Sequence, residues 1–317
     1  AGRTLIGGNL GGSLLDALPQ ITAQDLVVLE LSSFQLQRTP AVRWSPHVAL
    51  ITNLAPNHLD WHGTFNAYAA AKLNIVRFQD PERDRIIIGE DAALLATFDE
   101  MFGDHAGVWR YGLDGNAARA RCQSTSAAEF DDRVLRWDLP ALAAPGRHNR
   151  LNAGGALTVA AVLGLDTEQA SAALATFAGL PHRLRMVCRR DGVTYVDDSK
   201  STTPEAALTA LASFDVPLLL ILGGYDKGSD LGELAQAAAR RARYVACIGV
   251  TGPRIAAGVR AAGGEAGVHE SLEAAVAECR GRARDGDVVL LSPGCASWDM
   301  FEDYRARGAA FARSAQA

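Results

Sequence analysis

The sequence predicts an α/β fold with two domains, each organised around a mostly parallel sheet. Short apolar runs with strand character alternate with helical segments along nearly the whole chain, as in successive βαβ units. This alternation restarts after residues 179–183, which contain a glycine and a proline, so we expect one domain over residues 1–178 and another over 179–317. A chain of 317 residues, 48% of them hydrophobic, is long enough for two domains of ordinary size.

In the second domain, four predicted strands each run into a loop that bears glycine, serine or lysine. The strands cover residues 194–196, 218–222, 244–248 and 288–291, with helices between them. Because parallel strands all end at one edge of their sheet, we expect the four loops to lie together there, where open α/β sheets bind ligands.

The first of these loops carries Asp198 and Lys200 among several hydroxyl side chains. Thr203 and Pro204 predict the start of the next helix, with the threonine as its cap and the proline as its first residue. The free N–H groups of this helix end, together with Lys200, would suit an acidic substrate or a phosphate. The alternative is that Asp198 and Lys200 form an ordinary ion pair at the surface.

In the first domain, polar residues also follow predicted strands. Residues 26–29 are an unbroken apolar run, as expected for a strand covered on both faces, and Glu30 ends that run. A buried carboxylate needs a partner, and a metal ion is one candidate; the alternative is that Glu30 reaches solvent. After a second buried strand at 48–52, residues 53–63 hold two His, two Asn and an Asp. This composition suits a metal ligand or a general base, but also a polar loop with capping side chains.

Lys72 lies among apolar and small residues on a predicted helix at 65–78, so it either extends to water or has a buried role. Asn149 and Asn152 stand three residues apart at the start of a predicted helix at 153–163, where both could reach one bound group; the alternative is helix capping. The other expected elements are strands at 4–6 and 85–89, helices at 13–18, 91–102 and 167–178, and a small antiparallel excursion over 108–139.

The composition excludes several classes of protein. A net charge of −5 does not favour nucleic acid as a partner. The five cysteines are scattered without C-x-x-C spacing, which argues against a disulfide framework and a zinc site and favours a reducing compartment. No apolar run could span a bilayer and no signal peptide opens the chain, so we expect a cytoplasmic protein without a membrane partner. The chain starts without Met and almost at once enters a strand, so we also expect it to be cut from something longer.

Several segments, taken in order, resemble the Mur ligases, and two of them favour the members that add D-glutamate. Those two are Glu-Leu-Ser-Ser-Phe-Gln-Leu at 30–36 and Leu-Ser-Pro-Gly-Cys-Ala-Ser at 291–297. The others are residues 8–11, 53–63, 68–75, 146–153, 179–183, 198–200, 223–228 and 298–307. The resemblance implies that residues 1–178 are most of a central ATPase domain and that 179–317 are a Rossmann-like domain for the amino acid. It also implies that a UDP-binding domain and the Walker A loop lie upstream of this chain.

The resemblance further implies a reaction and its site residues. The reaction would join D-glutamate to UDP-N-acetylmuramoyl-L-alanine through an acyl phosphate, using ATP and Mg²⁺, in a monomeric enzyme of peptidoglycan synthesis. Catalysis and magnesium binding are implied for Glu30, His58 and Lys72, the last as a carbamate. ATP binding is implied for Asn149, Asn152, Arg183 and Asp198. Substrate binding is implied for Asn9, Ser32, Lys200, Thr202, Lys227, Ser297, Trp298 and Tyr304. Two alternatives stay open: an inactive fragment with the same fold, or a sister ligase for another amino acid.

Overall fold

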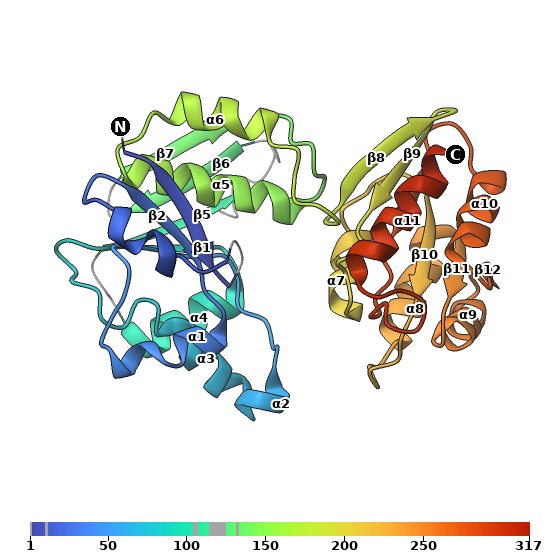
Figure 1. Ribbon diagram of the computed structural model, residues 1–317, viewed down its shortest axis with the longest axis horizontal. Helices are drawn as coiled ribbons and strands as arrows, with labels where there is room; N and C mark the ends of the chain where they lie inside the picture. The colour runs from blue at the N-terminus through green and yellow to red at the C-terminus, as the bar shows by residue number, and fades with distance from the viewer. Residues whose placement is uncertain (1, 10–11, 104–106, 114–124, 131–132) are drawn as a thin grey trace. The chain divides into compact units, whose positions relative to one another are not determined.

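The computed structural model describes residues 2–9, 12–103, 107–113, 125–130 and 133–317 (Figure 1). The chain divides into two compact units. Unit 1 comprises Ala1–Leu139 and Leu151–Ala170, and unit 2 comprises Pro140–Arg150 and Ser171–Ala317. The α/β fold class is confirmed, and the predicted domain limit after Ala178 stays a prediction. No helix that the structure describes is long and apolar enough to cross a lipid bilayer.

Unit 1 contains a five-stranded sheet in the order β3-β4-β5-β6-β7. The first three strands are parallel and the last two pairings are antiparallel, which confirms the predicted antiparallel excursion. The excursion was also expected to turn at residues 114–116 and 131–132, and these lie outside the described residues. The elements are β1 (Thr4–Gly8), η1 (Leu15–Gln20), β2 (Leu26–Glu30), α1 (Ser33–Leu36), η2 (Thr39–Ala41), β3 (Val48–Ile51), α2 (Leu59–His62), α3 (Phe65–Leu73), β4 (Arg85–Gly89), α4 (Ala92–Phe102), β5 (Val108–Leu113), β6 (Thr125–Phe130) and β7 (Arg133–Asp138). Helices α5 (Arg147–Val162) and α6 (Thr167–Thr176) contain residues of both units.

The five-stranded sheet is buried on both faces at β4. Ile86 and Ile88 point to one side, into a core shared with α3 and α4. Ile87 points to the other side, where it packs with Trp109 and with Leu151 of α5. The three consecutive isoleucines therefore form the kind of apolar run that a central parallel strand requires.

Strands β1 and β2 form a separate two-stranded parallel sheet, and here one expectation was wrong. The run at 26–29 is not covered on both faces, because Val27, Val28 and Leu29 are 38%, 46% and 37% exposed. Among the described residues no third strand pairs with these two, and two strands alone cannot enclose an apolar run. Glu30 at the end of β2 is also exposed, so its carboxylate is accessible from solvent.

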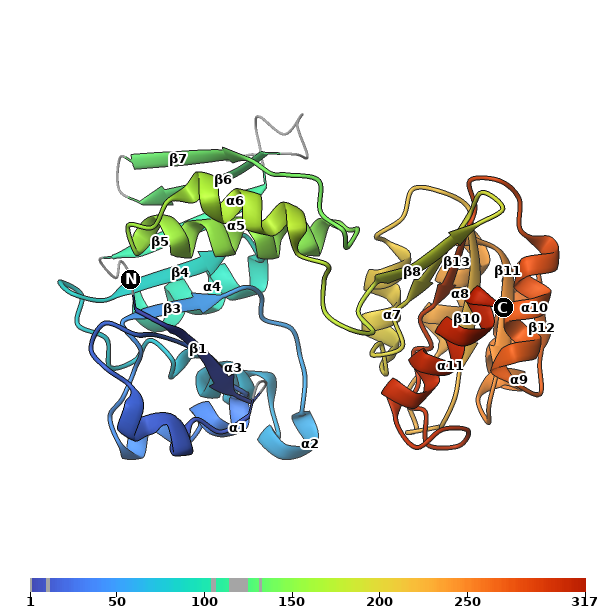
Figure 2. The ribbon, with the colours of Figure 1, turned by 45° about the horizontal axis from the view of Figure 1, so that its top comes forward.

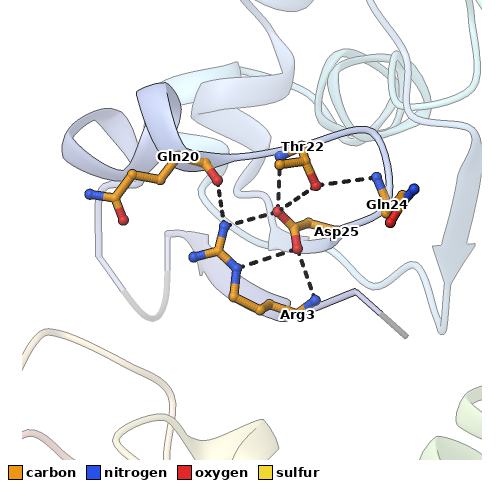
Figure 3. Close-up of polar contacts among 5 residues, drawn as sticks. All are labelled: Arg3, Gln20, Thr22, Gln24 and Asp25. Atoms are coloured by element: carbon orange, nitrogen blue, oxygen red, sulfur yellow. Dashed lines mark hydrogen bonds and ion pairs between the residues drawn. The ribbon is translucent and has the colours of Figure 1, made fainter.

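Polar contacts around Asp25 fasten the entry to β2 (Figure 3). Its carboxylate lies 3.0 Å from Nη2 of Arg3 and accepts the backbone N–H of Thr22 at 2.9 Å. Arg3 also donates to the carbonyl of Gln20. These contacts hold the pKa of Asp25 well below its usual range, with the Arg3 hydrogen bond as the largest cause.

Three helices differ clearly from what was expected, whereas α4 and α6 differ from their expected limits by only one or two residues. The helix expected at 13–18 is instead the 3₁₀ helix η1, which includes Pro19. Helix α3 is capped by Thr64 as predicted but ends at Leu73 rather than at 78, because the following N–H groups bond three residues back instead of four. Helix α5 begins at Arg147, earlier than predicted, directly after Gly146 in the left-handed region (φ 102°).

Unit 2 has a six-stranded sheet in the order β12-β11-β10-β13-β9-β8, parallel except for β8. All four predicted strands are confirmed; edge strands β8 and β12 were not predicted, since β8 is rich in arginine and β12 has three residues. The elements are β8 (Arg185–Arg190), β9 (Val193–Asp197), α7 (Pro204–Leu211), β10 (Leu218–Gly223), α8 (Gly232–Arg241), β11 (Ala242–Ile248), α9 (Gly252–Ala261), β12 (Ala266–Val268), α10 (Leu272–Arg282), β13 (Val288–Leu291) and α11 (Tyr304–Gln316).

Helices cover both faces of this sheet, which makes unit 2 a three-layer sandwich (Figure 2). On one side, Leu220 and Leu222 of β10 pack with α7, α8 and α9. On the other side, Leu219 and Ile221 pack with α10 and α11. The sheet is thus apolar on both faces along β10, and polar side chains gather at the ends of the strands and in the loops that follow them.

Candidate active site

The loops that follow the parallel strands of unit 2 are joined to one another by backbone hydrogen bonds. Gly294 donates to the carbonyl of Ser201 at 2.9 Å, which links the loop after β13 to the loop after β9. Tyr225 donates to the carbonyl of Ala296 at 2.9 Å, which links the loop after β10 to the same loop after β13. The N–H of Thr251 donates to the carbonyl of Gly224 at 3.0 Å, which links the loop after β11 to the loop after β10. The predicted gathering of four strand-end loops is therefore confirmed.

Two lysines at this edge lie over aromatic rings. Nζ of Lys200 is 5.6 Å from the ring centre of Tyr304, and Nζ of Lys227 is 4.8 Å from that of Trp298. Such cation–π contacts orient an ammonium group without neutralising it. Among the contacts that the structure describes, neither lysine has an ion pair. The edge thus presents two uncompensated positive charges to a ligand.

Two of the predicted substrate-binding residues, Thr202 and Lys227, line one pocket of unit 2. Asp226 and Ala296 contribute to the same wall. Ser297 is buried next to this wall, and its carbonyl accepts the N–H of Phe301 at 2.8 Å in the turn that leads to α11. A hydroxyl, a cation and backbone groups therefore meet in the wall of this small pocket.

The start of α7 was predicted correctly, because Thr203 Oγ1 accepts the N–H of Ala206 and Pro204 is the first helical residue. The alternative interpretation, an ion pair between Asp198 and Lys200 at the surface, is wrong: the described ion pairs do not include it. Asp198 is buried and accepts hydrogen bonds from Ser201 Oγ at 2.5 Å and Ser292 Oγ at 2.8 Å. Burial raises its pKa to about 6, although these hydroxyls act in the opposite direction.

The raised pKa of Asp198 gives unit 2 a pH dependence of stability. The unfolded chain releases this proton near pH 3.8 and the folded chain near 6, so the stability contribution is complete below pH 3.8 and is lost as the pH rises through 6. Between pH 5 and 7.5 we expect the free energy of unfolding to fall by about 1 to 1.5 kcal/mol relative to an Asp198→Asn variant. Urea unfolding of both proteins at the two pH values measures it, and a pH-independent difference would contradict it.

Arg307 of α11 was missed by sequence reasoning, since an arginine on a helix with other arginines looks like a surface residue. Its side chain is 1% exposed and connects two of the loops. It donates to the carbonyl of Ser199 at 2.8 Å and to the carbonyls of Cys295 and Ala296 at 3.1 and 3.2 Å. Burial lowers its pKa to about 10, so it stays charged at neutral pH.

We expect Arg307→Leu to destabilise the protein by roughly 3 kcal/mol or more, because it removes a buried charge-assisted donor and leaves the carbonyls of Ser199 and Cys295 without it. Arg313→Leu is the matched control, since Arg313 lies on the same helix and is exposed. Thermal unfolding of the parent and both variants tests this expectation. Equal losses for the two substitutions would show that the buried contacts of Arg307 contribute nothing specific.

A pair between His182 and Asp197 was also not predicted. Nδ1 of His182 lies 2.7 Å from the buried carboxylate of Asp197, and the His182 carbonyl accepts the N–H of Lys200 at 3.0 Å. The His182 ring meets the ring of Tyr304 edge to face at 5.9 Å between centres. These contacts hold Lys200 and Tyr304 next to each other. The spacing of these residues along the sequence does not predict the contacts.

In unit 1, the structure brings Lys72 and Glu30 close enough for their charges to interact. Burial lowers the pKa of Lys72, while the charge of Glu30 acts in the opposite direction. Nζ of Lys72 lies 5.7 Å from the ring centre of Tyr68. His58 has a left-handed backbone (φ 52°), and its ring lies tilted against that of Phe34 with 4.9 Å between the ring centres. No described hydrogen bond or ion pair joins His58 to Glu30 or Lys72.

The predicted magnesium ligands suit the ion in part. Over the described residues, no three His, Cys, Asp or Glu side chains are grouped closely enough to hold a metal ion. Mg²⁺ prefers oxygen ligands, of which Glu30 supplies a carboxylate. A carbamate on Lys72 would add a second carboxylate-like group beside it. The residues present therefore fit Mg²⁺ only if Lys72 is carbamylated.

The other predicted residues of unit 1 lie near the end of β2 or on α5. Asn9 donates its backbone N–H to the carbonyl of Glu30 at 2.7 Å, which keeps the two residues side by side. Ser32 caps α1 and forms a capping box with Gln35, so its hydroxyl already has a structural role. Asn152 lies on α5 and is exposed, so its side chain is accessible to a ligand from solvent.

Two further predicted ATP-binding residues belong to unit 2. Nδ2 of Asn149 donates to the carbonyl of Pro145 at 2.7 Å in the first turn of α5, so this side chain already has a backbone partner. Arg183 is exposed and lies near His148; burial first, and then the charge of Arg183, lowers the pKa of His148.

Comparison with known proteins finds matches along most of the chain. Residues 13–160 match the Mur ligase middle domain, and residues 182–295 match the Mur ligase, glutamate ligase domain. The chain is 37% identical over 321 residues to the UDP-N-acetylmuramoylalanine–D-glutamate ligase of Pelotomaculum thermopropionicum. This alignment covers 98% of the chain and 68% of that protein. The corresponding protein of a Roseiflexus species is 37% identical over 323 residues, covering 98% and 69%.

Among solved structures, the MurF ligase of Thermotoga maritima in complex with ADP resembles the chain with a TM-score of 0.63. The match covers 98% of this chain and 74% of that one at 16% identity, so it bears on the fold alone.

Proposed function

The chain belongs to the Mur ligase family, and we propose that it serves the ATP-dependent addition of D-glutamate to UDP-N-acetylmuramoyl-L-alanine in peptidoglycan precursor synthesis. The observation that carries this proposal is the 37% identity to a D-glutamate ligase over 98% of the chain. In the proposed reaction the alanyl carboxylate takes a phosphoryl group from ATP. The amine of D-glutamate then attacks the acyl phosphate, forms the amide bond and releases phosphate.

The strand-end edge of unit 2 supports this assignment electrostatically. D-glutamate brings two carboxylates, and Lys200 and Lys227 offer two ammonium groups without carboxylate partners of their own among the described contacts. Thr202 adds a hydroxyl in the same pocket as Lys227. We assign Ser297, Trp298 and Tyr304 to the surroundings of the amino acid, the two aromatic residues as supports for the lysines.

We assign the binding of ATP to four residues, Asn149, Asn152, Arg183 and Asp198. Because Asp198 is buried, it would act by holding Ser201 and Ser292 in place rather than by touching the nucleotide. We assign Asn9 and Ser32 to the UDP-linked substrate. Glu30, His58 and a carbamylated Lys72 would hold Mg²⁺, which neutralises charge on a transferring phosphoryl group. ATP and the UDP-linked precursor are cytoplasmic metabolites, so we place the reaction in the cytoplasm. We also expect the enzyme to be a monomer.

The test is an amino-acid panel on the protein expressed from its complete reading frame. Release of ADP and the mass of the product are measured with ATP, Mg²⁺, UDP-N-acetylmuramoyl-L-alanine and D-glutamate, L-glutamate, L-alanine or a diamino acid. We expect ADP release and product with D-glutamate alone. Turnover with another amino acid would indicate a sister ligase, and no turnover with any would indicate an inactive relative.

A further inference from the structure

Asp226 places a carboxylate in the wall of the pocket that we assign to D-glutamate. It lines this pocket together with Thr202 and Lys227, and it directly precedes Lys227 in the chain. An uncompensated carboxylate here would repel the carboxylates of a dicarboxylic amino acid and would offer Lys227 a competing partner. A pocket for a diacid therefore needs something that removes the charge of Asp226.

Arg254 of α9 supplies the compensating charge. Its Nη1 lies 3.2 Å from Oδ2 of Asp226, and its Nη2 lies 3.3 Å from Oδ1. Nη2 also donates to the carbonyl of Ser229 at 3.2 Å, and the N–H of Gly228 donates to Oδ1 of Asp226 at 2.8 Å. Both carboxylate oxygens are thus engaged, and the loop after β10 is fastened to α9 on either side of Lys227.

Lys227 is left without a carboxylate by this arrangement. Its Nζ lies over the ring of Trp298 rather than against its neighbour Asp226, with which it forms no described ion pair. Arg254, Asp226 and Lys227 together sum to one positive charge, whereas the two wall residues Asp226 and Lys227 alone would sum to zero. The pair formed by Arg254 and Asp226 is partly exposed, so its effect on overall stability is small and its effect on the pocket is the larger one.

We propose that Arg254 is a positioning residue of the amino-acid pocket, which neutralises Asp226 and thereby reserves Lys227 for a carboxylate of the substrate. The inference rests on the proposed function, because it takes the ligand of this pocket to be an amino acid with two carboxylates. It assigns Arg254 no contact with the substrate.

The experiment compares Arg254→Met with the parent enzyme, both expressed from the complete reading frame. We expect KM for D-glutamate to rise roughly five- to tenfold, with kcat at saturating D-glutamate and KM for ATP nearly unchanged. A second substitution, Asp226→Asn, removes the charge that Arg254 compensates, so the double variant should regain most of the parent's KM. Arg282→Met is the matched control: Arg282 pairs with Glu265 and Glu278 in the same unit, away from the pocket.

Each outcome bears on the inference in a defined way. An unchanged KM in Arg254→Met overturns it. A raised KM that Asp226→Asn does not restore also overturns it, because loop geometry rather than charge would then be responsible. An equal rise in Arg282→Met would show a general effect of lost positive charge and likewise overturns it. A parent enzyme that does not use D-glutamate refutes the proposed function, and this inference with it, before any variant is compared.

Discussion

Replacing Lys72 with alanine is expected to lower kcat by about 100-fold or more, while KM for ATP changes little. Lys72 lies beside Glu30, and burial lowers its pKa, so more of the amine is neutral than at an exposed lysine. A neutral amine can add CO₂ to form a carbamate and release a proton. The product carries a negative charge where the lysine carried a positive one, as a magnesium ligand next to Glu30 requires. Alanine cannot form this group, so the chemical step suffers more than nucleotide binding.

The Lys72 prediction has two checks besides turnover. With ¹³C-labelled bicarbonate, the parent should show a carbamate signal by NMR that the Lys72→Ala variant lacks. Short carboxylic acids added to the variant should restore part of its activity by filling the space of the missing group. A Lys72→Ala enzyme with normal kcat would contradict the role, and so would a parent with no carbamate signal.

Local signals in the sequence predicted much of the fold. The helix start at Thr203 and Pro204 follows from capping chemistry alone, and the buried isoleucines at 86–88 follow from a central parallel strand. The run at 26–29 carries the same signal but lies exposed, because burial depends on neighbouring elements that composition does not reveal. Edge strand β8 was missed for the opposite reason, since its polar residues hide its strand character.

The candidate site was predictable where residue type alone restricts the role. The chain has three lysines among its 31 basic residues, and they are Lys72, Lys200 and Lys227. Arginine serves wherever a permanent charge is enough, whereas a lysine can be carbamylated or can present a compact charge to a carboxylate. This scarcity is a signal that could have strengthened the assignment. Arg254 and Arg307 have no such signal, because their partners lie far along the chain and are identified only by folding.

The second large effect is expected at Lys200. Replacing it with alanine should raise KM for D-glutamate roughly 10- to 100-fold, since a charge-assisted hydrogen bond contributes about 1.5 to 3 kcal/mol. KM for ATP should change little, because the side chain lies over Tyr304 at the edge assigned to the amino acid. Arg189→Ala is the matched control: it removes one positive charge from exposed strand β8 of the same unit.

The Lys200 side chain has no carboxylate partner among the described contacts, so its loss leaves no buried charge behind and should not unfold the protein. A weaker amino-acid site is therefore distinguishable from a damaged fold by thermal unfolding. Steady-state kinetics over a range of D-glutamate concentrations gives kcat/KM for the parent and both variants. If kcat/KM for D-glutamate were unchanged in Lys200→Ala, the lysine would not meet a substrate carboxylate, and the assignment of this edge to the amino acid would depend on Lys227 alone.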